Sequence, residues 1–208
     1  MRRAVPMFSA LLLAVVACSP TNPGNPSTPS TTTSAGSSTE ATSAVPGPGV
    51  PKVEHPIDVA RFKNAPCDAL SEAQVAALLG AEASVKSDLK APAGPTCDWD
   101  SAGLSQAGVG VIFMSADQLG LTSVYEAKGK QYQLFEPQPP VNGFPIVAYG
   151  VNDERATRGR CAVAMGVSDT QAVDIHIAQS EVNIGKKDPC AAAHDVAAQV
   201  LGNLLGAN

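Results

Sequence analysis

The chain has 208 residues, a formal net charge of -5 at pH 7 and 16% charged residues. An acidic chain without a cluster of lysines and arginines has little with which to neutralise a phosphate backbone, so nucleic acid is excluded as a partner. The sequence has three histidines and no pair of cysteine and histidine at ligand spacing, so we expect no metal site and no cofactor.

The chain begins with a segment typical of a secretory signal. Arg2 and Arg3 precede an apolar run of about a dozen residues, which is too short for a membrane-spanning helix. The run ends in Val15-Val16-Ala17-Cys18, which resembles the lipobox of bacterial lipoproteins, with valine in the place that leucine usually takes. The resemblance implies removal of residues 1–17 and a diacylglyceryl group on Cys18. An ordinary signal peptide and an uncleaved anchor are the alternatives.

Two acyl chains on one cysteine make a stable membrane anchor, whereas a single chain binds only marginally. We therefore expect the mature protein to lie at the outer face of the cell membrane, outside the cytoplasm. The membrane itself, reached through the lipid on Cys18, is the first partner that the sequence predicts.

Residues 18–51 are predicted to be a disordered linker. Beyond Cys18 they consist almost wholly of Ser, Thr, Pro and Gly, a composition that cannot bury an apolar core. A flexible coil of this length has ends about 30 Å apart, which would hold a domain away from the bilayer. An O-glycosylated stalk is the alternative to a plain spacer. Residues 52–208 remain for a globular domain, and their number suits one domain.

The first half of this domain is predicted to contain two helices and two strands. Ser71 and Gln74 have the spacing of a capping box, which indicates the start of the first helix. Residues 96–100 and 108–114 have the residue pattern of two strands. Ser115 is then placed to cap a second helix.

The second half contains the clearest strand pair of the chain. Residues 160–167 and 173–177 alternate apolar residues with small or polar ones on either side of a short turn, which predicts a β-hairpin. Asp188 and Pro189 have the order of a helix cap followed by an N1 proline, and apolar residues then recur at helical spacing. The order of elements predicts an α+β domain, with a single antiparallel sheet of about five strands and helices mainly on one face.

Four cysteines besides Cys18 are expected to form two disulfides, because an even number of thiols in an oxidising compartment normally pairs. Three connectivities are possible. We favour neighbours in sequence, each closing a loop of about 30 residues. The absence of a CxxC motif argues against metal or catalytic cysteines. The favoured pairs are Cys67 with Cys97 and Cys161 with Cys190.

The arrangement of these cysteines is similar to that of a known family. Pro66-Cys67-Asp68 opens the domain, Cys97-Asp98-Trp99 follows, and Cys161 and Cys190 form a later pair. This layout resembles domain-of-unknown-function family 3558 over roughly residues 57–205. The resemblance implies a lipoprotein of an actinobacterial envelope. It implies no catalytic residue and no cofactor.

Asp174 and His176 are the one candidate pair for catalysis. They lie two residues apart on one predicted strand and so share a face of the sheet. Such a pair can do acid–base work or contribute to a metal site. If the helices cover the opposite face, the pair lies on the solvated side of the sheet, and this is the interpretation that we favour.

Residues 132–149 are interpreted as an irregular segment, and they hold half of the aromatic side chains of the domain together with four prolines. Aromatic side chains held in place by proline are typical of recognition loops. The alternative is a long connection whose apolar residues are tucked into the core. The candidate binding residues are Tyr132, Phe135, Phe144 and Tyr149.

The sequence thus predicts a membrane-anchored extracytoplasmic lipoprotein whose domain binds a protein, a lipid or a glycan of the cell envelope. A binding role is favoured over an enzymatic one because no nucleophile lies next to a base in the sequence. The alternative is an envelope hydrolase or transferase that uses Asp174 and His176. A purely structural or accessory subunit is the third possibility.

Overall fold

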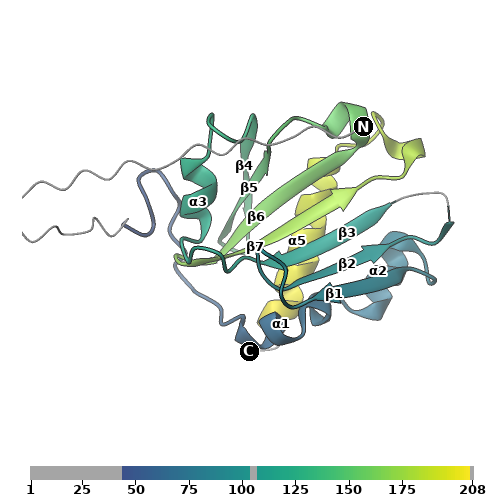
Figure 1. Ribbon diagram of the computed structural model, residues 1–208, viewed down its shortest axis with the longest axis horizontal. Coiled ribbons are helices and arrows are strands. Elements are labelled where there is room, and N and C mark those ends of the chain that lie inside the picture. Colours follow the sequence, from purple (N-terminus) through teal and green to yellow (C-terminus); the bar gives the residue numbers. More distant parts are fainter. Residues whose placement is uncertain (1–43, 104–106, 207–208) are drawn as a thin grey trace, which may run out of the picture. The chain divides into compact units, whose positions relative to one another are not determined.

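A single antiparallel sheet organises the chain in the computed structural model, which describes residues 44–103 and 107–206 (Figure 1). The predicted signal 1–17, the lipidation site Cys18 and the predicted linker as far as residue 43 lie outside the described residues. The strands are arranged in the order β1-β2-β3-β7-β6-β5-β4. Their bounds are β1 (Ser84–Asp88), β2 (Thr96–Asp100), β3 (Gly108–Phe113), β4 (Leu134–Val141), β5 (Phe144–Gly150), β6 (Arg160–Ser168) and β7 (Gln171–Ala178).

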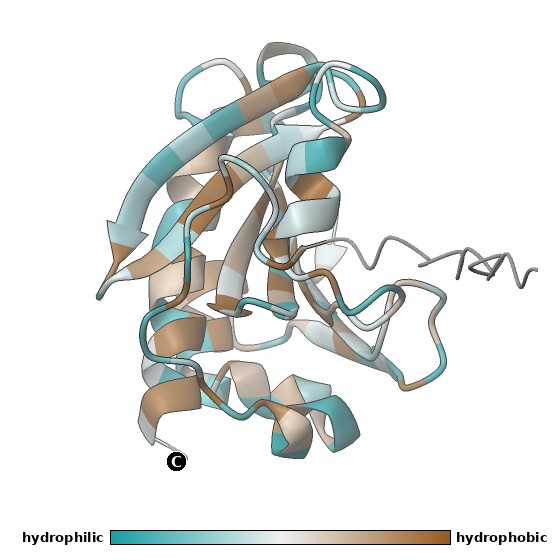
Figure 2. Ribbon diagram, turned by 90° about the vertical axis from the view of Figure 1, so that its left-hand side faces the viewer, coloured by the Kyte–Doolittle hydropathy of each residue, from teal (hydrophilic) through white to brown (hydrophobic). Residues whose placement is uncertain are grey.

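Helices lie on both faces of this sheet. Figure 2 views the β4 edge and shows α5 on one side and α3 on the other. Of the helices in the described ranges, none is long and apolar enough for a membrane crossing. The helical elements are α1 (Ala60–Asn64), η1 (Pro66–Ala69), α2 (Glu72–Leu79), α3 (Leu121–Glu126), α4 (Arg155–Arg158), η3 (Glu181–Asn183) and α5 (Pro189–Gly206).

The main core lies between α5 and one face of β6 and β7. Successive strand residues point to opposite faces, so the alternating apolar residues of this hairpin all face the helix. Val163, Met165, Val173 and Ile175 are fully buried there against the apolar side of α5. Residues of α1, η1 and α2 extend the same core.

The opposite face of the sheet is covered by α3 and by the chain that precedes α1. Leu121 and Val124 of α3 pack against Val147, Ala164 and Ala172 of the sheet. Residues before and after position 52, the predicted start of the domain, also form hydrogen bonds with this side of the sheet. The Gly47 amide donates to Thr122 Oγ1 (3.0 Å), and the Val53 amide donates to Asp169 Oδ1 (2.9 Å). This small apolar cluster leaves part of the face uncovered.

Two of the three predicted helix starts with a polar cap are confirmed. Ser71 Oγ accepts from the Gln74 amide (3.3 Å), and the Ser71 amide donates to Gln74 Oε1 (2.8 Å), which completes the capping box of α2. Asp188 Oδ1 accepts from the Cys190 amide (2.8 Å) at the start of α5. Local side-chain to backbone bonds of this kind depend only on neighbouring residues.

The predicted disulfides are also confirmed, with Cys67 bonded to Cys97 and Cys161 bonded to Cys190. The first joins η1 to β2, and the second joins β6 to the first turn of α5. Each therefore ties a helical element to the sheet.

The strand count was underestimated, since the sheet has seven strands rather than about five. Residues 132–149 are mostly the β4–β5 hairpin and not an irregular segment. Its turn, Asn142-Gly143, has φ angles of 47° and 85°, as a tight type I′ hairpin requires. The prolines of β4 are tolerated because β4 is an edge strand.

The predicted start of the second helix was wrong. The helix begins at Leu121, and its N-cap is Gly120 rather than Ser115. Gly120 has a φ of 55°, and a Cβ at this position would collide with the backbone of Asp169. Tertiary contact with the β6–β7 turn thus decides where α3 begins.

Phe144→Ala should lower the free energy of unfolding by about 3 kcal/mol, because it leaves a cavity in the main core. Phe144 is 5% exposed, whereas Phe135 is only half-buried on the opposite face. Phe135→Ala is therefore the matched control and should cost less than half as much. Urea unfolding of the two variants measures both values, and equal losses would contradict this placement of Phe144.

Candidate functional site

One row of residues crosses the sheet on the face opposite α5. The strand register places Asp98 opposite Gly110, Gly110 opposite His176, His176 opposite Ala162, and Ala162 opposite Tyr149. Residues from β2, β3, β7, β6 and β5 are thereby brought side by side. The row depends on the pairing of β3 with β7, two strands that are far apart in the sequence.

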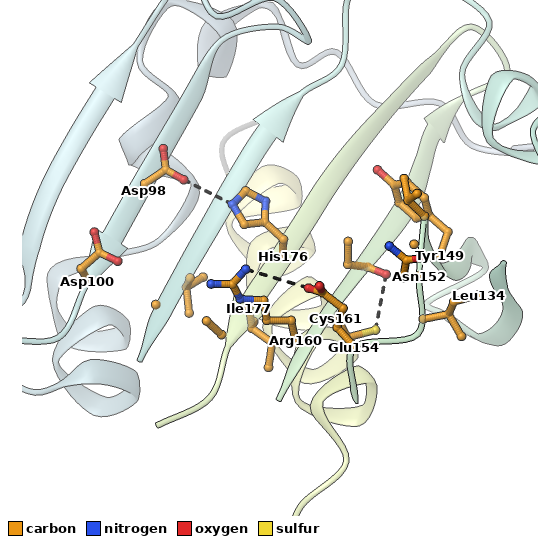
Figure 3. A pocket seen from close by; sticks show the side chains of 16 residues that line it. Asp98, Asp100, Leu134, Tyr149, Asn152, Glu154, Arg160, Cys161, His176 and Ile177 are labelled. Carbon is orange, nitrogen blue, oxygen red and sulfur yellow. Dashed lines mark hydrogen bonds and ion pairs between the residues drawn. The ribbon is translucent and has the colours of Figure 1, made fainter. Parts of the chain in front are cut away.

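Four polar side chains in and beside this row are joined by hydrogen bonds and charge contacts, and we call them the polar network. His176 Nδ1 lies 2.9 Å from Asp174 Oδ1. His176 Nε2 lies 3.3 Å from Asp98 Oδ1 (Figure 3). The Tyr149 hydroxyl donates to Asp174 Oδ2 at 2.7 Å. Both oxygens of the Asp174 carboxylate are therefore engaged.

Small residues in β3 and β6 make room for this network. A Cβ at Gly110 would overlap the His176 imidazole and the Asp98 carboxylate. Glycine normally weakens a strand interior because it adds no packing and costs backbone entropy. At this position its lack of a side chain lets the ring of His176 lie across the strand and reach Asp98.

The network changes the protonation of two of its members. Burial lowers the pKa of His176, but the hydrogen bond and negative charge of Asp174, together with Asp98, outweigh burial and raise this pKa above 6.5. Burial raises the pKa of Tyr149 far above its usual value, and the charge and hydrogen bond of Asp174 add to the effect. Tyr149 thus remains a neutral donor.

A concave site of about 460 Å³, which we call the trough, begins at this network and extends to one end of the sheet (Figure 3). Gly108, Ala162 and Ala178 are small residues of neighbouring strands that line it. Arg160 NH1 lies 3.9 Å from Glu154 Oε2 beside it. Its polar lining residues are Asp98, Asp100, Tyr149, Asn152, Glu154, Arg160 and His176.

The described lining of the trough offers few groups for nucleophilic chemistry. Both ring nitrogens of His176 contact carboxylates, which favours the imidazolium form and occupies the nitrogen that a general base would use. The described lining residues include neither serine nor threonine, and their one cysteine, Cys161, is disulfide-bonded. Within the described ranges no group of three potential ligands is arranged to hold a metal ion.

The predicted aromatic residues do not form one patch. Tyr132 packs edge-on against Tyr149, with ring centroids 4.8 Å apart, and Phe135 packs edge-on against Tyr125 at 4.9 Å. These side chains pack against the small apolar cluster that α3 forms with the sheet, whereas Phe144 is buried in the core on the α5 side. Phe144 and Tyr149 face opposite ways because they lie five positions apart, an odd number, on one strand.

The predicted pair, Asp174 and His176, does share one face of β7, but only His176 is in contact with solvent to a large extent. The His176 side chain is 40% exposed, whereas the Asp174 side chain is only 6% exposed. Among the described residues His55 and His194 lie elsewhere, and His194 Nε2 contacts the Pro139 carbonyl oxygen at 2.9 Å.

Sequence reasoning missed Asp98, Gly110 and the role of Tyr149 in the polar network. No local pattern connects these residues with His176, since their meeting depends on strand order and register. A glycine in the middle of an apolar strand was the one usable signal, because such a glycine often marks a close approach.

The sequence profile of a family described as proteins of unknown function, DUF3558, matches residues 13–203. No curated protein and no solved structure is detectably similar to the chain.

The raised pKa of His176 predicts that its charge stabilises the fold at low pH. This contribution is complete below about pH 6.5 and is lost as the pH rises through the raised native pKa. The difference in unfolding midpoint between the wild type and His176→Gln should therefore be largest below about pH 6.5 and shrink as the pH rises above it. A difference that is independent of pH would contradict the charged state.

NMR titration of the His176 ring provides the matched comparison. Asp98→Asn should lower the pKa of His176 relative to the wild type, because it removes one of the charges that raise it. Asp100→Asn, two residues along the same strand, should leave that pKa unchanged.

Proposed function

Because the chain belongs to the DUF3558 family of proteins of unknown function, we propose its role from the trough and from the segment before the domain. The protein is an extracytoplasmic lipoprotein, anchored at the outer face of the cell membrane through Cys18, and its domain binds a ligand of the cell envelope in the trough. The observation that carries the binding role is the trough itself, a concave site whose polar groups are held in place by one another.

The size and lining of the trough support this role. Its volume of about 460 Å³ lies within the range of small-molecule sites, roughly 300 to 1,000 Å³. The carboxylates of Asp98, Asp100 and Glu154 accept hydrogen bonds, whereas Val109, Leu134 and Ile177 supply apolar surface. These groups fit a ligand that combines an apolar part with hydroxyl or amino donors.

The membrane address is supported by the sequence alone. The apolar run after Arg2 and Arg3 ends at Ala17-Cys18, and a linker of Ser, Thr, Pro and Gly separates Cys18 from the domain. An anchored domain on a long tether presents a site to the cell envelope without further contacts to the bilayer.

A second candidate is an envelope hydrolase or transferase that uses Asp174 and His176. The observation in its favour is the 2.9 Å contact between the two side chains, which orients the imidazole as acid–base catalysis requires. Against it stands the contact of His176 Nε2 with Asp98. If activity screening finds equal rates for the wild type and His176→Ala, this candidate loses its base.

Cys18→Ser should move the protein from the membrane fraction to the soluble or secreted fraction, because the substitution removes the thiol that would carry the lipid. Ser19→Ala is the control, since it changes the next residue and keeps that thiol. Cell fractionation and the intact mass of the membrane-bound form measure the effect. An intact mass of the membrane-bound wild type that includes residues 1–17 and no lipid would exclude the lipid anchor.

Ligand binding is tested by native mass spectrometry of the full protein released from its own membrane. We expect an additional mass that the same protein lacks when it is made in a foreign host. Ala178→Leu fills the trough and should remove this mass, whereas Ala76→Leu on the exposed side of α2 should retain it. A bare mass from the native source, or equal loss in both variants, would contradict binding in the trough.

A further inference from the structure

The two edges of the sheet differ in how they are protected. The outer strand β4 contains Pro137, Pro139 and Pro140, and its register with β5 shifts between Gln138 and Val141. Prolines and irregular register are common means of preventing an edge from pairing with another chain. The β4 edge is thus blocked.

The β1 edge has none of these devices. All five residues of β1 are exposed, and their register with β2 is continuous from Ser84 opposite Asp100 to Asp88 opposite Thr96. β1 contains neither proline nor glycine, and in the described ranges no strand pairs with its outer side. A regular strand with a free edge can accept another strand.

The sequence of β1 is complementary to itself in one antiparallel register. When two copies are centred on Ser87, Lys86 of each lies opposite Asp88 of the other, so two pairs of opposite charge form. In the same register Val85 lies opposite Leu89, the turn residue that directly follows β1. These two apolar side chains are 59% and 52% exposed in the single chain.

The two symmetric registers nearest to this one are less favourable. Only every second residue of an edge strand directs its backbone N–H and C=O groups away from the sheet. When two identical strands pair antiparallel, these residues must lie opposite each other, so the two-fold axis passes beside a residue and not between two residues. A pair centred on Lys86 sets lysine against lysine, and a pair centred on Asp88 sets carboxylate against carboxylate. Like charges in directly opposite positions are destabilising.

We propose that two copies of this chain associate through their β1 strands, antiparallel and centred on Ser87. The sheet then continues from one copy into the other around a two-fold axis, as in other isologous dimers. Lys86 and Asp98 are cross-strand neighbours, so the two charge pairs lie on the face that carries the trough. Both troughs therefore open on the same side of the dimer.

The test measures self-association of the full chain by sedimentation equilibrium over a range of concentrations. The interface is small, so the wild type should be a weak, reversible dimer. Lys86→Asp and Asp88→Lys should each weaken association about tenfold, because each turns two attractive pairs into repulsive ones. The double variant Lys86→Asp/Asp88→Lys restores opposite charges and should associate about as well as the wild type.

Lys186→Asp is the matched control, because it makes the same change in net charge on an exposed residue outside β1. The proposal is overturned if the wild type remains monomeric at every concentration, if the double variant stays as weak as the single ones, or if the control weakens association equally. The register has its own test: Val85→Cys and Leu89→Cys should form a disulfide-linked dimer when mixed, and neither should do so alone.

Discussion

The packing of α5 against β6 and β7 is the interaction on which the rest of the structure depends. Successive side chains of a strand point to opposite faces of the sheet. Val163 and Ile175 face the helix, and their neighbours in sequence therefore face the other way; these include Ala162, Ala164 and His176. The Cys161–Cys190 disulfide joins β6 to the first turn of this helix. One face of the hairpin is thereby filled with large apolar side chains, and the other is left with small or polar ones. On that second face α3 covers one part, and the trough lies in another.

The parts of the fold that the sequence predicts are those encoded by neighbouring residues. The capping box at Ser71, the proline at the start of α5 and the alternation along β6 and β7 all act over a few positions. The missed strands are the edge strands β1 and β4, together with β5, which lies next to β4. β1 is exposed on both faces and has no apolar alternation, while the prolines of β4 indicated a loop, although an edge strand accommodates them. The Asn142-Gly143 turn was the strongest available signal for the β4–β5 hairpin.

The candidate site is less predictable than the fold, because it is assembled by register. The spacing of Asp174 and His176 on one strand was sufficient to place them on one face. Their partners Asp98 and Tyr149 come from β2 and β5, on either side of the β6–β7 hairpin, and no local pattern sets that strand order. The aromatic segment illustrates the same limit, since alternation along β5 sends Phe144 to the core and Tyr149 to the polar network.

The burial of Asp174 is the physical basis of the proposed binding role. A carboxylate removed from water costs free energy unless hydrogen bonds and an opposite charge compensate it, and here the Tyr149 hydroxyl and His176 provide them. Asp98 holds the other side of the imidazole, so His176 is fixed in orientation before any ligand arrives. A general base needs a free nitrogen and a pKa near the working pH. A binding site gains instead from groups that are already ordered, because less conformational entropy is lost when the ligand binds. The same contacts that occupy both nitrogens of His176 thus weaken it as a base and fix its orientation, as the proposed binding role requires.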